Sequence, residues 1–327
     1  MKAILVDPQT SGLYIGEAPD PVPGEGELLV AVKATALNRA DLLQRIGQYP
    51  PPPGASPILG LEMAGVVERV GGGVSGWRPG DRVCALLPGG GYAEKAVIPA
   101  GMAIRIPERF TFEEAAAIPE VFLTAYLNLF VLGGLSAGET VLVHAGASGV
   151  GTAAIQLARE AGCAAIATAG SEEKLRACLR LGARDAVNYK TESFADCVLA
   201  ATDGEGAHLI LDPVGASHWE QNFRSVRTGG RWVVIGGLGG QEVERFQLGA
   251  FLRKRIRLIF STLRPLPVQE KIRLTEQFVR FAGERFESGA LVPVVDRIFP
   301  WTEAEEAHAY MKSNRNIGKI VLRIGEG

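Results

Sequence analysis

The chain has 327 residues, of which 47% are hydrophobic and 21% are charged, and its formal charge at pH 7 is −2. This composition excludes wholesale disorder, and the length suits two domains of ordinary size. The small net charge gives no reason to expect nucleic acid or an anionic membrane as a partner.

The chain contains no apolar run near the roughly 18 residues of a membrane span, and its N-terminal apolar run is too short for the core of a signal peptide. Its four cysteines form neither a C-x-x-C pair nor a disulfide framework; they are Cys84, Cys163, Cys178 and Cys197. Free thiols are typical of a reduced compartment, so we expect a cytoplasmic protein.

The first 120 or so residues are rich in glycine and proline and predict short strands between turns, which is typical of a small, irregular β-barrel. The predicted strands are Leu28–Ala36, Met63–Val70, Asp81–Leu87 and Ala93–Pro99. Between the first two lies a segment with four consecutive prolines, Pro50 to Pro53, which cannot be helix or central strand, so we predict an ordered loop there.

From about Val121 the pattern becomes α/β, beginning with a predicted helix over Phe122–Leu132. The apolar run Thr140–His144 predicts a buried parallel strand, and a glycine-rich turn and an amphipathic helix follow it. Such a turn places free N–H groups at a helix N-terminus, where a phosphate binds. The dinucleotide fingerprint G-x-G-x-x-G falls on Gly146, Ser148 and Gly151, so serine replaces its middle glycine.

Two other interpretations of this turn stay open on the motif alone. A nucleophile elbow, G-x-S-x-G, also joins a strand to a helix, but Val150 stands where that motif needs its second glycine. An ordinary tight turn is the other. Five more strands, separated by helical stretches, favour the dinucleotide site because six strands complete a doubly wound sheet; they are Ala164–Thr168, Ala186–Asn188, His208–Asp212, Arg231–Gly236 and Ile256–Ser261.

The last part of the chain predicts a helix over Gln269–Glu287, a strand over Val292–Ile298, a helix over Glu303–Met311 and a terminal strand. We expect these segments to rejoin the first domain. One domain would then comprise residues 1–121 and 262–327, and the nucleotide-binding domain, residues 122–261, would be inserted in it.

The end of the second strand of this sheet predicts which nucleotide binds. NAD-binding proteins place an Asp or Glu there for the ribose hydroxyls, but this chain has Gly170 and Ser171, which leave room for a 2′-phosphate. Lys174 supplies a positive charge, and Tyr189 can stack on or donate to the adenosine phosphate. We therefore predict NADPH. The neighbouring Glu172 and Glu173 argue against it unless they serve the helix dipole.

Several stretches together resemble the medium-chain dehydrogenase/reductase superfamily, and within it the zinc-free, ζ-crystallin-like quinone oxidoreductases. They are ALNRADLLQRIGQYPPPPGAS, LLPGGGYAEKAVIP, AAAIPEVFLTAY, HAGASGVGTAAIQLA and NRNIGKIVL. The resemblance implies a Rossmann doubly wound parallel sheet plus a GroES-like β-barrel catalytic domain, the cofactor NADPH, and hydride transfer to a quinone in the interdomain cleft.

Zinc-dependent relatives take catalytic ligands from a Cys three residues before an Asp and from the His of a G-H-E motif. Here Asn38 precedes Asp41 and Leu61 precedes Glu62, and neither Asn nor Leu is a plausible zinc ligand. We predict no metal. Alcohol dehydrogenation would lack its Lewis acid, whereas a quinone is already electrophilic.

The resemblance places Asn38, Asp41 and Tyr49 at the catalytic site. Asn38 would hold the nicotinamide ribose or carboxamide, and Tyr49 would hydrogen-bond a quinone oxygen or transfer a proton to it. Turn chemistry is the alternative for all three, with equal weight for Asp41. We expect the cofactor to contact Thr124, Gly146, Ser148, Gly149, Val150, Gly151, Gly170, Ser171, Lys174, Tyr189, Gly236 and Asn316.

Two alternatives to a quinone oxidoreductase remain. An enone or enoyl-thioester reductase would use the same hydride donor with Tyr49 as proton donor. A non-catalytic NADPH-binding protein would bind without turnover. We also expect the last strand, Ile256–Ser261, to be an exposed sheet edge that pairs with its copy in a homodimer. The four histidines lack spaced partners and are predicted to be structural or surface residues.

Overall fold

The computed structural model describes residues 1–325, and the chain divides into two compact units. Unit 1 comprises Met1–Leu123 and the chain from Arg264 onward, and unit 2 comprises Thr124–Leu263. Each boundary lies two residues after the one predicted from the sequence.

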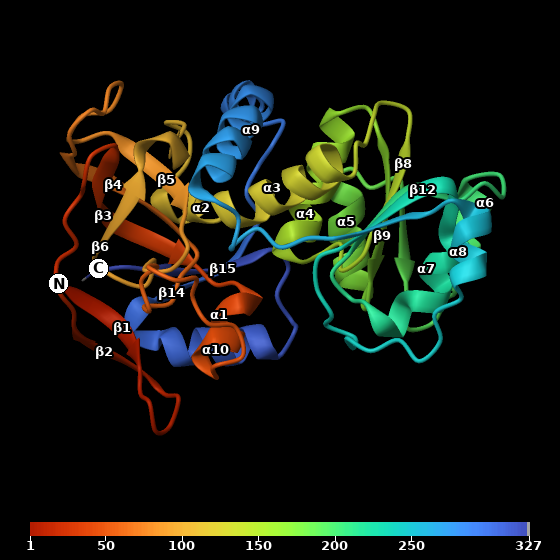
Figure 1. Ribbon diagram of the computed structural model, residues 1–327, viewed down its shortest axis with the longest axis horizontal. Helices are drawn as coiled ribbons and strands as arrows, with labels where there is room; N and C mark the ends of the chain where they lie inside the picture. The colour runs from red at the N-terminus through yellow and green to blue at the C-terminus, as the bar shows by residue number, and fades with distance from the viewer. Residues whose placement is uncertain (326–327) are drawn as a thin grey trace. The chain divides into compact units, whose positions relative to one another are not determined.

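Unit 1 is built on a mixed sheet that the C-terminal segment completes; its pairs are antiparallel except for β14 and β15, which run parallel. Its strands follow the order β14-β15-β3-β4-β5-β7, and β6 also pairs with β3. Figure 1 shows the blue C-terminal strand β15 beside the red strand β3, with which it pairs antiparallel. The bounds are β3 Glu27–Ala36, β4 Glu62–Val70, β5 Arg82–Leu86, β6 Lys95–Pro99, β7 Ala103–Arg105, β14 Val295–Pro300 and β15 Lys319–Arg323. A separate hairpin joins β1 Lys2–Val6 to β2 Leu13–Glu17.

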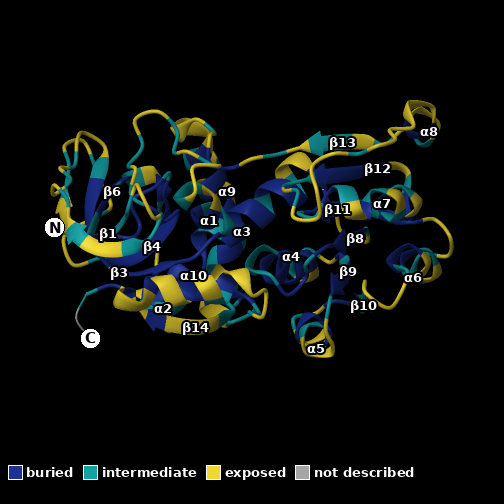
Figure 2. Cartoon of the chain, turned by 90° about the horizontal axis from the view of Figure 1, so that it is seen from below, coloured by how far each residue is buried: buried dark blue, intermediate teal, exposed yellow. Residues whose placement is uncertain are grey.

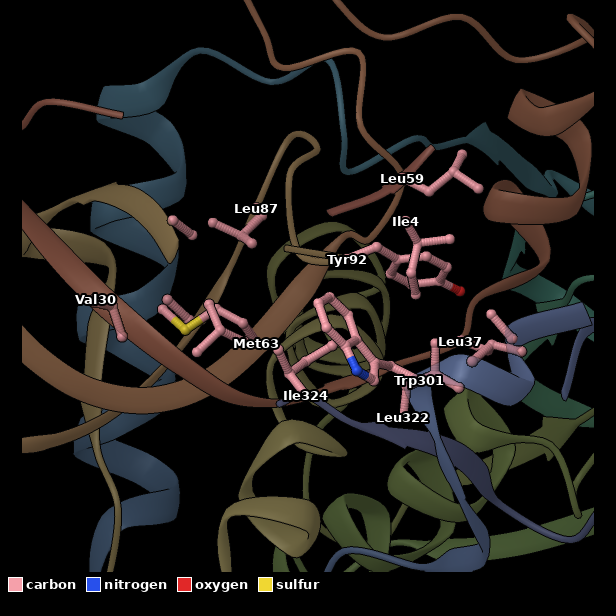
Figure 3. Packing of buried hydrophobic residues seen from close by; sticks show 14 of the residues in the cluster. Ile4, Val30, Leu37, Leu59, Met63, Leu87, Tyr92, Trp301, Leu322 and Ile324 are labelled. Atoms are coloured by element: carbon pink, nitrogen blue, oxygen red, sulfur yellow. The ribbon is translucent and has the colours of Figure 1, made fainter. Parts of the chain in front are cut away.

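The core of unit 1 draws residues from both ends of the chain. Figure 3 shows Ile4, Met63, Tyr92 and Trp301 packed among the sheet residues. The first three are at most 1% exposed and Trp301 is 6% exposed. Burial of this apolar surface is what ties the returning C-terminal segment to the N-terminal strands.

The helices of unit 1 include one that the sequence analysis missed. They are α1 Arg39–Arg45, α2 Phe112–Ala116, α9 Val268–Ser288 and α10 Ala304–Lys312. The segment predicted as a loop begins with α1 because Asn38 is its N-cap and the Asp41 carboxylate accepts the Asn38 backbone N–H, at 2.8 Å. The prolines 50–53 follow the helix and form no element.

Unit 2 contains a six-stranded parallel sheet with the order β10-β9-β8-β11-β12-β13. In chain order this is the 3-2-1-4-5-6 arrangement of a doubly wound dinucleotide-binding fold, so the predicted fold class is confirmed. The bounds are β8 Thr140–Val143, β9 Ala164–Ala169, β10 Asp185–Asn188, β11 Ala207–Asp212, β12 Val226–Val234 and β13 Arg257–Phe260.

Five further helices connect these strands: α4 Gly149–Glu160, α5 Glu172–Arg180, α6 Phe194–Ala201, α7 Trp219–Ser225 and α8 Leu248–Lys254. The predicted helix over 122–132 is instead two pieces. The α-helix α3, Pro119–Tyr126, continues as a π-helix over Leu127–Leu132. Such widened turns are rare and frequently occur at functional sites.

Burial differs sharply across this sheet. In Figure 2 the central strands β8 and β9 are dark blue, whereas β13 and α8 carry exposed residues. Trp232 on β12 is fully buried, while Phe260 on β13 is 71% exposed. The edge strand thus presents apolar surface to solvent. Among residues 1–325, none of the helices combines the length and the apolar composition that a membrane-spanning helix needs.

Candidate active site and cofactor site

The glycine turn after β8 has no room for side chains. A Cβ on Gly151 would collide with the carbonyl oxygen of Ala145, and one on Gly146 would lie 2.8 Å from the Cβ of Ala167. Ala145 itself has a positive φ of 49°, which is rare for a residue with a side chain. The turn therefore holds the backbone close to β9 and leaves the first turn of α4 accessible from the carboxyl end of the sheet.

Ser148 explains how this turn functions without the middle glycine of the fingerprint. It is the N-cap of α4, and its Oγ accepts the Gly151 N–H at 3.0 Å. The N–H groups of Gly149 and Val150 lie in the first turn, where no intrahelical carbonyl is available to them. These donors and the helix dipole suit a pyrophosphate.

A buried chain of hydrogen bonds underlies the turn. His144 Nδ1 lies 2.9 Å from the Thr168 hydroxyl oxygen, and His144 Nε2 lies 2.6 Å from Asn222 Oδ1. Asn222 Nδ2 donates to Asp212, which also accepts the Trp232 indole N–H. Because Asn222 offers its oxygen to the ring, Nε2 is the protonated nitrogen and Nδ1 accepts from Thr168. Burial lowers the pKa of His144 to about 4, so the ring is neutral at pH 7.

The end of β9 holds the residues predicted to select NADPH. Ser171 is the N-cap of α5, with Lys174 one turn into that helix. A Cβ built on Gly170 would lie 3.1 Å from the Tyr189 hydroxyl oxygen and 3.3 Å from the Lys190 ammonium nitrogen. The hydroxyl and the ammonium therefore converge on the small residue that follows β9. Sequence reasoning missed Lys190, although this lysine directly follows Tyr189 and could have been noticed for that reason.

Thr124 and Gly236 also lie in unit 2. Thr124 is 8% exposed, and its carbonyl accepts the Asn128 Nδ2–H at 2.7 Å. Asn128, in the π-helix, keeps a buried side-chain oxygen that has no hydrogen-bond partner among the described residues. Gly236 follows β12, where a Cβ would lie 3.0 Å from the Pro213 carbonyl oxygen.

In unit 1 the Asn38 side chain is the centre of a buried ionic cluster. Its Nδ2 donates to Glu62 Oε1 at 2.9 Å, and its Oδ1 accepts from Lys319 Nζ at 2.6 Å. Lys319 and Glu62 form an ion pair at 2.8 Å with side chains 4% and 0% exposed. Glu62 also accepts the Glu120 N–H. Sequence reasoning did not assign Glu62 or Lys319 to the site.

Asp41 is fully buried beside this cluster. Its carboxylate accepts the N–H groups of Asn38 and Gly60, and the Tyr92 hydroxyl lies 3.3 Å away. Burial raises the pKa of Asp41 to about 6, against the opposing effect of the two backbone donors. The Tyr92 hydroxyl also lies 3.1 Å from Nε2 of the buried His308. Asp41 thus holds the start of α1, and its catalytic role stays a prediction.

Tyr49 lies in the loop after α1 and is partly buried. The Arg264 guanidinium carbon is 5.2 Å from its ring centroid, and Arg264 donates to the Tyr49 carbonyl oxygen at 3.2 Å. Burial raises the pKa of the Tyr49 hydroxyl, and the positive charge of Arg264 acts against that shift. Arg264 is another residue that sequence reasoning missed. Asn316, expected at the cofactor, donates to the Gly318 carbonyl oxygen in the turn before β15.

The structure therefore brings the predicted residues together in two groups. Unit 1 gathers Asn38 and Asp41 at the start of α1, with Tyr49 on the loop behind that helix. The carboxyl end of the sheet in unit 2 gathers the glycine turn and the residues that follow β9 and β10. No cluster of three His, Cys, Asp or Glu side chains that could hold a metal ion occurs within residues 1–325.

Comparison with known proteins places this chain in a family. Residues 24–108 match the alcohol dehydrogenase GroES-like domain, and residues 149–279 match the zinc-binding dehydrogenase family. The human synaptic vesicle membrane protein VAT-1 homolog is 31% identical over 318 residues, covering 93% of this chain and 81% of the relative. The rat quinone oxidoreductase is 31% identical over 308 residues, covering 92% and 90%.

Solved structures agree with these relatives. The quinone oxidoreductase of Thermus thermophilus, solved alone and with NADPH, is 34% identical with a TM-score of 0.84, covering 99% of this chain and 100% of that one. The chain belongs to the medium-chain dehydrogenase/reductase superfamily of oxidoreductases, as the motifs predicted. The predicted cofactor, NADPH, is confirmed at the level of this family.

Proposed function

We propose that this protein is an NADPH-dependent, zinc-independent oxidoreductase that reduces a quinone by hydride transfer. The observation that carries the proposal is the end of β9, where Gly170 and Ser171 replace the acid of NAD-binding relatives and Tyr189 and Lys190 converge on the glycine. A 2′-phosphate fits such a site because it meets a hydroxyl, an ammonium and helix N–H donors.

In this reaction, residues of the chain would bind the cofactor, donate a proton and orient the ligand. When bound, NADPH supplies the hydride. Ser148 and the first turn of α4 would hold its pyrophosphate. Tyr49 gives its hydroxyl proton to the quinone oxygen that becomes negative, so that a hydroquinone leaves. Asn38, fixed by Glu62 and Lys319, keeps one lone pair of its side-chain oxygen for a ligand.

Zinc independence is part of this proposal. Asn38 and Leu61 occupy the positions of the two catalytic zinc ligands, and the Asn38 amide is engaged with Glu62 and Lys319 rather than open to a metal. A quinone needs no Lewis acid, since it accepts a hydride readily. We therefore expect activity to persist after dialysis against a chelator.

A reductase of enones or enoyl thioesters is the second candidate. The Tyr49 hydroxyl has no hydrogen-bond partner within residues 1–325, which leaves its proton available for a substrate carbon as well as for an oxygen. A non-catalytic NADPH-binding protein is the alternative of another class, and it would bind the cofactor without turnover. We also propose a cytoplasmic homodimer that pairs through β13.

The test is oxidation of NADPH and NADH by the purified protein, side by side, with an ortho-quinone, a para-quinone and an enone. We expect rapid loss of NADPH with a quinone, slower loss of NADH, and no change after chelator treatment. A preference for the enone would move the protein to the double-bond reductases. Tight NADPH binding without turnover on any acceptor would identify a binding protein.

A further inference from the structure

Arg264 is a buried cation at the point where the chain re-enters unit 1. It is only 6% exposed. Its Nε donates to the Pro88 carbonyl oxygen at 2.8 Å, its Nη1 to the Tyr49 carbonyl oxygen at 3.2 Å, and its Nη2 to Gln44 Oε1 at 2.6 Å. One guanidinium therefore joins α1, the loop after it, and the turn at Pro88.

A second buried cation lies directly behind the first. Lys271 on α9 is 5% exposed, and its Nζ donates to the Arg264 carbonyl oxygen at 2.6 Å. Within residues 1–325 neither side chain forms an ion pair with a carboxylate. Buried Arg and Lys side chains are nearly always paired, so two adjacent cations without an anion leave a positive potential unused by the fold.

Tyr49 is the group on which this potential acts. The Arg264 guanidinium lies over its ring, 5.2 Å from the centroid. The other charge that acts on the hydroxyl is Glu120, which raises its pKa, while Arg264 lowers it; Asp41 is a further carboxylate that Arg264 senses. A phenol in a partly buried position is a poor acid unless a cation stabilises the phenolate it leaves behind.

We propose that Arg264, whose backbone carbonyl is held by Lys271, is a positioning residue that fixes the Tyr49 ring and stabilises the phenolate formed when Tyr49 protonates the reduced substrate. In this step the Tyr49 O–H bond breaks and an O–H bond forms on the substrate oxygen, which the hydride has made anionic. The class of substrate is thus one on which the hydride leaves an oxygen anion: a quinone becomes a hydroquinone monoanion, and an enone becomes an enolate. The inference rests on the proton-donor role given to Tyr49 under the proposed function.

The experiment measures ionisation of Tyr49 without using activity. Tyrosinate absorbance is titrated in the full-length protein, and the curve of Tyr49→Phe is subtracted to isolate the Tyr49 midpoint. In Arg264→Met the midpoint should rise, by up to about one pH unit, because a nearby opposite charge that favours the phenolate has been removed. Lys271→Met should give a smaller rise, and Arg264→Lys should retain most of the wild-type midpoint.

Arg273→Met is the matched control, since it removes an exposed positive charge from the same helix, α9, and should leave the midpoint unchanged. If Arg264→Met does not fold, Arg264→Gln replaces it in the test, because its neutral amide removes the charge and keeps a hydrogen-bond donor at this position. An unchanged midpoint in a folded variant overturns the inference. Turnover is then measured separately: a shifted midpoint with full activity in Tyr49→Phe would overturn the donor role of Tyr49 and leave the electrostatic assignment standing.

Discussion

In unit 1 a buried ion pair and the amide between its partners orient one another. Lys319 and Glu62 are both buried, and each would be costly alone, since removing one partner of a buried pair leaves an uncompensated charge. Their shared partner, Asn38, is thereby fixed in one orientation by a donor contact and an acceptor contact. The two residues that orient the Asn38 amide, Glu62 and Lys319, are distant from it in sequence, so this orientation exists only in the folded unit.

Selection of NADPH is expected to depend on two lysines. Replacing Lys190 or Lys174 by Met would remove the charge-assisted hydrogen bond that we propose each makes to the 2′-phosphate, and each change should raise the KM for NADPH about tenfold. The KM for NADH should stay within about twofold, because NADH lacks that phosphate. Steady-state kinetics with both cofactors check this.

Arg180→Met supplies the control for this pair of variants, since it removes an exposed basic residue from the last turn of the same helix, α5, away from Ser171. Equal losses of affinity for NADPH and NADH in Lys190→Met would contradict the assignment. They would mean that Lys190 supports the structure around Gly170 instead.

Site residues could be predicted where a local motif fixes their place. The fingerprint spacing indicates Gly146, Ser148 and Gly151, and counting onward along the chain indicates Gly170 and Lys174; their contact with the cofactor stays a prediction. Arg264 and Lys319 could not be found this way, because their partners are distant in sequence and a lone basic residue has no spacing to test. Asn38 and Tyr49 stay predictions as catalytic residues.

Elements of the parallel sheet were predictable because buried strands between helices are short apolar runs bounded by turns. All six expected strands occur, each within a few residues of its predicted ends except β12, which begins five residues earlier at Val226. The helix α1 was missed because its flanking prolines dominated the pattern. The π-helix after α3 was missed because a widened turn depends on packing and leaves no period in the sequence.

The edge strand β13 and the helix before it expose large apolar side chains. Phe260 on this strand is 71% exposed, and Leu252 on the preceding helix, α8, is 67% exposed. An open edge with apolar side chains favours pairing with a second copy. We expect the wild type to be the proposed dimer and Phe260→Lys to be a monomer, as measured by light scattering after size-exclusion chromatography.

Its control is Val22→Lys, which replaces an equally exposed apolar residue, 74% exposed, in unit 1. This variant should remain dimeric and unfold as the wild type does. A wild-type protein that is monomeric at micromolar concentration, or a Phe260→Lys protein that stays dimeric, would rule out assembly through this strand.

At the scale of the whole molecule, the two units differ in how their buried groups respond to acid. Unit 2 contains three histidines with lowered pKa values. Burial is the main cause for each, and it brings the pKa of His144 to about 4 and also lowers those of His218 and His208. The unfolded chain binds protons at these sites near pH 6.5, whereas the folded unit does not, so unit 2 loses stability as pH falls below 6.5.

Unit 1 has opposing groups over the same range. Burial lowers the pKa of His308 to about 3, so this residue costs stability as pH falls from 6.5. Burial also raises the pKa of Asp41 to about 6, so the folded unit takes up a proton before the unfolded chain does. That uptake stabilises unit 1 as pH falls from about 6 toward 3.8. The two effects have opposite sign and similar size, so they largely cancel.

As pH falls, unit 2 should therefore lose stability before unit 1 does. Between pH 6.5 and pH 5.0, which lies above the range where carboxylates with lowered pKa values titrate, His144 alone should cost unit 2 about 1.5 kcal/mol. Hydrogen exchange, corrected for the intrinsic rate at each pH, should show protection falling in β8 and β9 while β3 and β4 change little.

His308→Leu removes the opposing group of unit 1, so β3 and β4 should become better protected at pH 5.0 than at pH 6.5. Loss of protection first in β3 and β4 of the wild type would refute the assignment, because it would require buried histidine charge in unit 1 to outweigh that in unit 2.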